Sequence, residues 1–89
     1  MSRLDKTIQK WRSNTPNEIK KDEIFPVLDE YFQDYEIKKG SHIVVRDDRL
    51  SRHPKCFNSE FTIAIKNGRK IKGVYLKLVL ELINYLESI

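Results

Sequence analysis

The hydrophobic positions of the first dozen residues follow a helical period. Leu4, Ile8 and Trp11 stand at positions i, i+4 and i+7, and charged or polar residues fill most of the positions between them. This spacing places the three apolar side chains on one face of a helix. The sequence therefore predicts a short amphipathic helix within residues 1–14, ahead of a core over 15–89.

A second helical pattern follows, and a proline interrupts it. Thr15 and Glu18 have the spacing of a capping box, which marks the start of a helix. Pro26 lies farther along, where a proline inside a helix would remove a hydrogen bond and clash with the preceding turn. We therefore expect one short turn over 16–20 and a main helix over 22–33, with Pro26 in its first turn.

The pattern then changes to the two-residue alternation of β-strands. A turn at Gly40 and a polar loop over 47–59 separate three expected strands, which cover residues 35–38, 41–46 and 60–66. A final apolar helix is expected over 74–87. This order predicts an α+β fold, in which helices pack on one face of a three-stranded antiparallel sheet.

Alternation along the last two strands separates an apolar face from a polar one. The apolar side, expected to face the helices, carries Ile43, Val45, Phe61, Ile63 and Ile65. The opposite side carries a histidine and cationic or small residues, namely His42, Val44, Arg46, Thr62, Ala64 and Lys66. A histidine among cations favours the handling of anions, because imidazole exchanges a proton near neutral pH.

Two other kinds of site are weighed against this one. Ser41 precedes His42, but adjacent strand residues point to opposite faces, so we do not expect their side chains to hydrogen-bond. No Gly-x-Ser-x-Gly motif supports a serine hydrolase. His53 and Cys56 have a spacing that suits a metal, yet a structural zinc site requires four ligands. The sequence therefore predicts neither a metal site nor a cofactor.

The final helix is apolar around most of its circumference. Its polar stripe is narrow and consists of Lys77, Glu81, Asn84 and Ser88. Two interpretations stay open: the N-terminal helix covers the surplus apolar surface, or the helix forms a protein interface, homodimeric or with a partner chain. The four tyrosines of the chain are interpreted as core or rim residues rather than as platforms for nucleobases.

Charge is divided into blocks along these 89 residues. An acidic stretch over 22–37 precedes a strongly basic stretch over 38–80, and the net charge is +4. Such a basic block suits nucleic acid, although a solvated surface of mixed charge is the alternative. The single cysteine excludes an internal disulfide, and neither a membrane-spanning stretch nor a secretory signal is evident. We expect a cytoplasmic protein that does not associate with membranes.

Two runs of residues resemble a known family. The run KKGSHIV at 38–44 resembles the Gly-Ser-His strand motif of HicA-type toxins, which are small bacterial mRNA interferases. The run GRKIKG at 68–73, which leads into an apolar helix, resembles the basic turn and last helix of the same family. The resemblance covers about residues 15–87.

This resemblance implies a fold like that of double-stranded-RNA-binding domains, in the order α-β-β-β-α, to which this chain adds an N-terminal helix. It implies cleavage of mRNA with His42 as the catalytic residue, and neutralisation by a HicB-type antitoxin protein. RNA would then be held by the basic residues Lys38, Lys39, Arg46, Lys66, Arg69, Lys70 and Lys72. A non-catalytic RNA-binding module and a protein-interaction domain, including a homodimer, stay open as alternatives.

Overall fold

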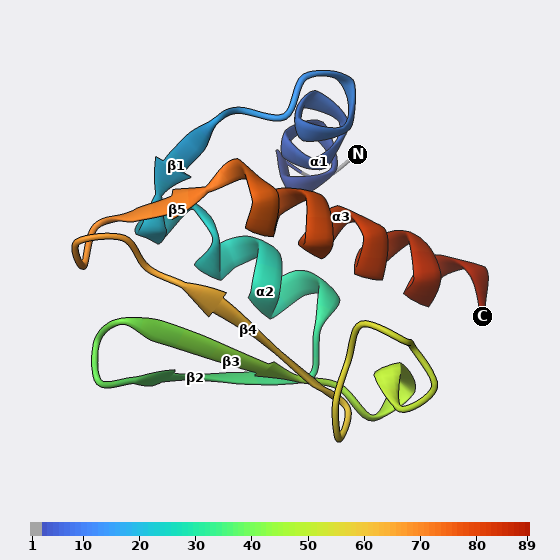
Figure 1. Ribbon diagram of the computed structural model, residues 1–89. Helices are drawn as coiled ribbons and strands as arrows, with labels where there is room; N and C mark the ends of the chain where they lie inside the picture. The colour runs from blue at the N-terminus through green and yellow to red at the C-terminus, as the bar shows by residue number, and fades with distance from the viewer. Residues whose placement is uncertain (1–2) are drawn as a thin grey trace.

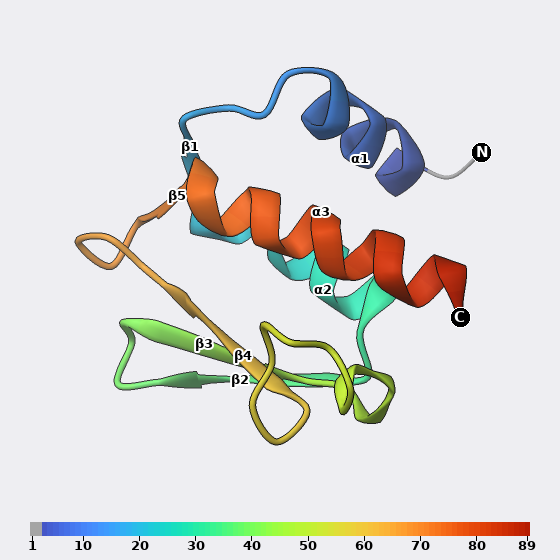
Figure 2. The same ribbon diagram turned by 45° about the vertical axis from the view of Figure 1, so that its right-hand side comes forward.

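The computed structural model describes residues 3–89, and the main sheet and the helices in it form separate layers. The elements in chain order are α1 (Arg3–Ser13), β1 (Glu18–Lys20), the 3-10 turn η1 (Lys21–Glu23), α2 (Phe25–Tyr31), β2 (Asp34–Lys38), β3 (His42–Arg46), the 3-10 turn η2 (Asp48–Leu50), β4 (Glu60–Ala64), β5 (Lys70–Lys72) and α3 (Gly73–Ser88). Figures 1 and 2 place α2 and α3 against one face of the main sheet, with α1 farther out.

The main sheet has the predicted form. Its three strands run antiparallel in the order β2-β3-β4, so β3 is central. The β2–β3 turn contains Lys39 and Gly40, both with positive φ, at 53° and 67°. Glycine adopts this left-handed conformation without strain, and for this reason Gly40 marks the turn in the sequence. The prediction of an α+β fold with helices on one face of an antiparallel sheet is confirmed.

The expected helical turn over 16–20 is wrong, because residues 18–20 form strand β1. This strand pairs antiparallel with β5 as a separate two-stranded sheet, in which Ile19 lies opposite Ile71 and both are buried. Thr15 does not begin a helix, since its hydroxyl donates to the carbonyl of Trp11 at the end of α1. The hydrogen bonds and apolar contact offered by β5, some fifty residues away, override the local helix signal.

The main helix is shorter than the predicted 22–33. Residues 21–23 form η1, whose start is capped by a hydrogen bond from the Lys20 amide to the Glu23 carboxylate. Helix α2 then spans Phe25–Tyr31 and holds Pro26 in its first turn, as expected. Phe32 leaves the helix in an extended conformation, so the chain enters β2 directly.

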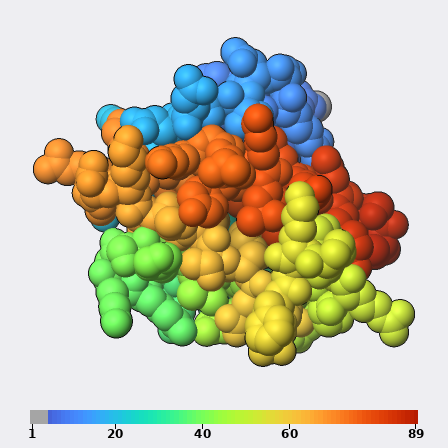
Figure 3. Space-filling view, viewed as in Figure 1, coloured from blue at the N-terminus to red at the C-terminus, as the bar shows by residue number. Residues whose placement is uncertain are grey.

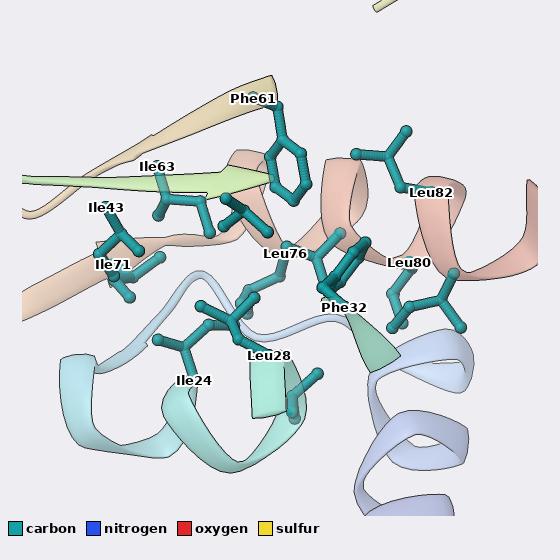
Figure 4. Close-up of a cluster of buried hydrophobic side chains, with 14 of the residues drawn as sticks. Ile24, Leu28, Phe32, Ile43, Phe61, Ile63, Ile71, Leu76, Leu80 and Leu82 are labelled. Atoms are coloured by element: carbon teal, nitrogen blue, oxygen red, sulfur yellow. The ribbon is translucent and has the colours of Figure 1, made fainter. Parts of the chain in front are cut away.

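The apolar face of the sheet meets the helices as predicted. Ile43, Val45 and Ile63 are fully buried, and Phe61 and Ile65 nearly so. Figure 4 shows side chains of β3 and β4 directed toward Ile24 and Leu28 on the α2 side. This layer of branched side chains is the hydrophobic core that fixes the orientation of the sheet.

Helix α1 covers the surplus apolar surface of α3. Ile8 and Trp11 are buried in the common core, while the side chain of Leu4 lies outside the described residues. At the rim, the Arg12 guanidinium donates to Asn84 and Glu87 of α3, at 2.7 and 2.9 Å. The first of the two interpretations, coverage by the N-terminal helix, is therefore confirmed.

The expected loop over 47–59 is ordered by contacts of its own. Asp47 is buried, accepts from the amides of Gln33 and Arg49, and forms an ion pair with the Arg49 guanidinium at 2.7 Å. Burial raises the pKa of Asp47, but these hydrogen bonds outweigh it and hold the pKa below its usual value. These contacts anchor the loop to the end of the main sheet at which β3 ends.

Candidate nucleic-acid interface

The face of the main sheet turned away from the helices is uncovered by any helix of residues 3–89 (Figures 1 and 2). Residues that lie opposite each other in antiparallel strands share a face, so the register defines three rows across it. Along the strands from the β2–β3 turn these rows are Lys38–His42–Ala64, Glu36–Val44–Thr62 and Asp34–Arg46–Glu60. The prediction that His42, Val44, Arg46, Thr62 and Ala64 share this open face is confirmed.

His42 is exposed and begins β3 directly after the turn. Its ring contacts the preceding residue, since the Ser41 Oγ lies 2.9 Å from His42 Nδ1. The expectation that these side chains point apart is wrong, because Ser41 belongs to the turn, where strand alternation does not apply. When Nδ1–H donates to the Ser41 hydroxyl, the neutral ring leaves Nε2 unprotonated and able to accept a proton.

A hydroxyl beside an imidazole does not by itself make a hydrolase, because the base must in turn be oriented by a third group. Within residues 3–89, no carboxylate forms a hydrogen bond or an ion pair with His42. Ser41 therefore orients the ring, and Nε2 is the nitrogen free to meet a ligand on the open face.

Arg46 occupies the acidic end of the same face. Its guanidinium donates to Glu36 at 2.9 Å and to Glu60 at 3.1 Å. Hydrogen bonding to Glu36, and then to Glu60, raises the pKa of Arg46, and the bond from Arg46 lowers the pKa of Glu36. Arg46 lies four residue steps along β3 from His42, a distance of about 13 Å. The structure thus couples Arg46 to two carboxylates and does not bring it to His42.

The position of Lys66 also differs from the expected strand over 60–66. Strand β4 ends at Ala64, and Ala64 is the residue opposite His42. Lys66 instead forms a β-bridge with Lys70, and its ammonium lies 3.9 Å from the Glu18 carboxylate. Lys66 therefore lies beside β5, next to the second sheet, rather than in the row that contains His42.

A row of three lysines crosses the second sheet. Lys70 lies opposite Lys20 in the β1–β5 pair and opposite Lys66 in the β-bridge. We call Lys20, Lys66 and Lys70 the lysine row. Like charges placed directly opposite each other destabilise a sheet unless an anion lies between them. Lys20 is not among the residues predicted from sequence, because its alternation with buried Ile19 covers only three residues.

The lysine row and His42 lie at the same end of the molecule. The Ile65 amide donates to the Ser41 carbonyl at 2.7 Å, which ties the end of β4 to the turn before His42. Figures 1 and 2 place the β2–β3 turn and the β4–β5 turn at this end. Arg69 is exposed on the latter turn, Lys72 follows on β5, and Lys38 and Lys39 border the former turn. Seven cations are thus gathered at one end: Lys20, Lys38, Lys39, Lys66, Arg69, Lys70 and Lys72.

His53 lies elsewhere, in the loop at the opposite end of the sheet. It is buried, its Nδ1 accepts from the Lys55 amide, and its ring packs edge-on against Tyr85 at 4.9 Å. Burial raises the pKa of the Cys56 thiol nearby. In the described part of the chain, no three metal-ligating side chains form a cluster.

Comparisons with known proteins give no family for this chain. No protein-family model, curated protein or solved structure matches it. In residues 3–89, none of the helices has both the length and the apolar character needed to cross a bilayer.

Proposed function

We propose that this protein is a bacterial endoribonuclease of the HicA type, which cleaves mRNA with His42 as the proton-transfer residue and without a metal. The observation that carries the proposal is the exposed imidazole on an uncovered sheet face, at the end where the basic side chains gather. The order α2-β2-β3-β4-α3 is consistent with the double-stranded-RNA-binding-domain-like fold of that family. The proposed location is the cytoplasm.

In the proposed reaction, His42 acts on the ribose beside the scissile phosphate. Its unprotonated ring nitrogen removes the proton of the 2′-hydroxyl, and the 2′-oxygen attacks phosphorus. A bond forms between the 2′-oxygen and phosphorus while the bond to the 5′-oxygen breaks. The leaving oxygen takes a proton from water, and the His42 imidazolium returns its proton to the hydroxide that remains. The products are a 2′,3′-cyclic phosphate and a 5′-hydroxyl end. Ser41 keeps the ring in orientation through Nδ1.

The basic side chains have separate tasks in this proposal. Lys38 and Lys39 lie nearest to His42 along the chain and balance negative charge that develops on the phosphate. Lys66, Arg69, Lys70 and Lys72 hold neighbouring phosphates. Arg46 is assigned to the stability of the sheet instead, because Glu36 and Glu60 already occupy its donors.

The test uses purified protein and single-stranded mRNA in the presence of EDTA. Wild type is expected to produce 2′,3′-cyclic phosphate ends, and His42→Ala should cleave about 10²- to 10⁴-fold more slowly. Because His42 is exposed, the variant should keep the unfolding transition of wild type. Equal cleavage by both proteins would refute the catalytic assignment. RNA binding by both without cleavage would favour the non-catalytic RNA-binding module.

A protein partner follows from the same proposal. A toxin of this type is held inactive by a HicB-type antitoxin, so expression of this chain alone should arrest bacterial growth, and co-expression of the neighbouring small open reading frame should relieve the arrest. Normal growth of cells that express the unaltered chain alone would contradict its proposed role as a toxin. The apolar surface of α3 gives little support for a homodimer, because Ile8 and Trp11 of α1 cover much of it.

A further inference from the structure

A small cavity lies beyond the end of β4, beside the first turn of α3. Its volume is about 250 Å³, and it is lined by Ala64, Ile65, Lys66, Lys72 and Tyr75. Pockets for drug-sized ligands typically measure about 300–1,000 Å³, so this one suits a smaller group. The lining combines one aromatic ring, two ammonium-bearing side chains and aliphatic surface.

The cavity shares one residue with the row that contains His42. Ala64 lies opposite His42 in the sheet and also lines the cavity. Adjacent strands are about 4.8 Å apart, so the cavity begins within about 10 Å of the β3 backbone at His42. The methyl group of Ala64 is the smallest side chain of that row. Figure 3 shows the surface of the β2–β3 turn beside that of the segment from β4 to β5.

Tyr75 provides a flat apolar wall on the helix side. It is half-buried, packs against the hydrophobic core and contributes to the cavity lining. Tyr75 therefore lies at the rim of the core, and part of its side chain stays accessible there. This accessibility favours the role of platform for a nucleobase, which the sequence pattern alone disfavours. Aromatic side chains of this kind stack on nucleobases. Removal of such a ring lowers the affinity for nucleic acid about 5- to 150-fold.

The two lysines supply the complementary charge. Lys66 is about half exposed, and its ammonium lies 3.9 Å from Glu18, which also faces Lys72 across the β1–β5 pair. One carboxylate thus accompanies two lysines, at 3.9 Å from the Lys66 ammonium and opposite Lys72 in the sheet, so net positive charge remains for a ligand. A base with its phosphate satisfies both the aromatic wall and the cations, whereas an apolar peptide would leave the ammonium groups without a partner.

We propose that this cavity is a nucleotide subsite for single-stranded RNA, in which Tyr75 stacks on a base while Lys66 and Lys72 bind its phosphate. This inference rests on the proposed function and extends it, because the bound nucleotide would lie roughly one or two positions from the phosphate that His42 serves. Tyr75 is thus a positioning residue, and the cavity contributes to the RNA sequence preference. The lysine row continues the path for the phosphates beyond it.

Binding can be measured without cleavage by using a 2′-deoxy oligonucleotide, which lacks the attacking hydroxyl. Tyr75→Ala should weaken its binding about tenfold or more, whereas Tyr75→Phe, which keeps the ring, should stay within about twofold of wild type. Val74→Ala is the matched control, because Val74 precedes Tyr75 on α3, is exposed and does not line the cavity. Mononucleotide titrations followed by NMR should perturb Ala64 and Tyr75 and leave Val74 unaffected.

The outcomes separate this inference from the proposed function. RNA cleavage by wild type, with binding and cleavage positions unchanged in Tyr75→Ala, would overturn the subsite alone. Tyr75-dependent binding in a protein that cleaves nothing would overturn the nuclease and support the subsite. If Tyr75→Ala does not fold, the exposed double variant Lys66→Ala and Lys72→Ala decides, since loss of two phosphate contacts should reduce the salt slope by about 1.4. An unchanged slope would overturn the subsite.

Discussion

The two ends of the main sheet treat their polar side chains in opposite ways. At the end next to the 47–59 loop, Asp47 is bound by Arg49, and Arg46 by two carboxylates. At the other end, the exposed His42 hydrogen-bonds to its neighbour Ser41. Lys38 and Lys66 there each lie near one carboxylate, of Glu36 and Glu18, whereas the other five cations gathered at that end form no ion pair within residues 3–89. Polar groups that satisfy each other stabilise the fold, and groups left partly unsatisfied are available for a ligand.

The two histidines give the strongest test of this comparison. His42→Ala should reduce RNA cleavage about 10²- to 10⁴-fold and leave the free energy of unfolding within about 0.5 kcal/mol of wild type. His53→Ala should do the reverse. It should lose about 1–3 kcal/mol of stability, because the Lys55 amide loses its acceptor, and keep the activity of the folded fraction. Denaturant titration and cleavage rates, measured on the same samples, check both effects. A loss of stability in His42→Ala together with a loss of cleavage in folded His53→Ala would contradict the comparison.

Removal of the buried carboxylate should have the next largest effect. Asp47→Ala should lower the free energy of unfolding by about 2–3 kcal/mol, because the amides of Gln33 and Arg49 lose a charged acceptor. Asp48→Ala is a matched control, since Asp48 is exposed on the same 3-10 turn. Equal stability of the two variants would show that the loop is not held through Asp47.

Charge reversal at the basic end should weaken binding without unfolding the protein. Lys70→Glu together with Lys72→Glu should lower RNA affinity about tenfold or more and flatten its dependence on salt, because fewer counterions are released. Arg46→Gln, at the acidic end of the open face, should leave the salt slope unchanged. An equal loss of slope in both proteins would remove the distinction between the two ends.

The smallest predicted effect is a pH dependence of stability at the acidic end. The pKa of Asp47 is lowered in the folded protein, so its contribution is fully present above the unfolded value of about 3.9 and is lost as the pH falls through the folded value. Wild type should therefore lose stability below about pH 4 more steeply than Asp47→Asn. Parallel curves from thermal unfolding at several pH values would contradict this assignment.

The sequence predicted correctly what depends on local periodicity. Alternation alone separated Ile43 and Ile63, which are buried, from exposed His42, because the side chains of a strand point to the two faces in turn. Pro26 marked the start of α2 for an equally local reason, since its ring fits only the first turn. The spacing of Ile8 and Trp11 likewise indicated a helix with one buried face.

Pairing between distant segments was decided by the tertiary structure. The residues of β1 form a strand only because β5 lies beside them, and this pairing brings Lys20 to Lys70. Register likewise set Glu60 opposite Arg46, with Glu36 one row away on β2 and within reach of its guanidinium. It also put Ala64, rather than Lys66, opposite His42. A sequence pattern states which face a residue occupies, because that follows from its own backbone. Which residue lies across from it depends on how the chain folds back, and that relation fixes the charge of each end of the sheet.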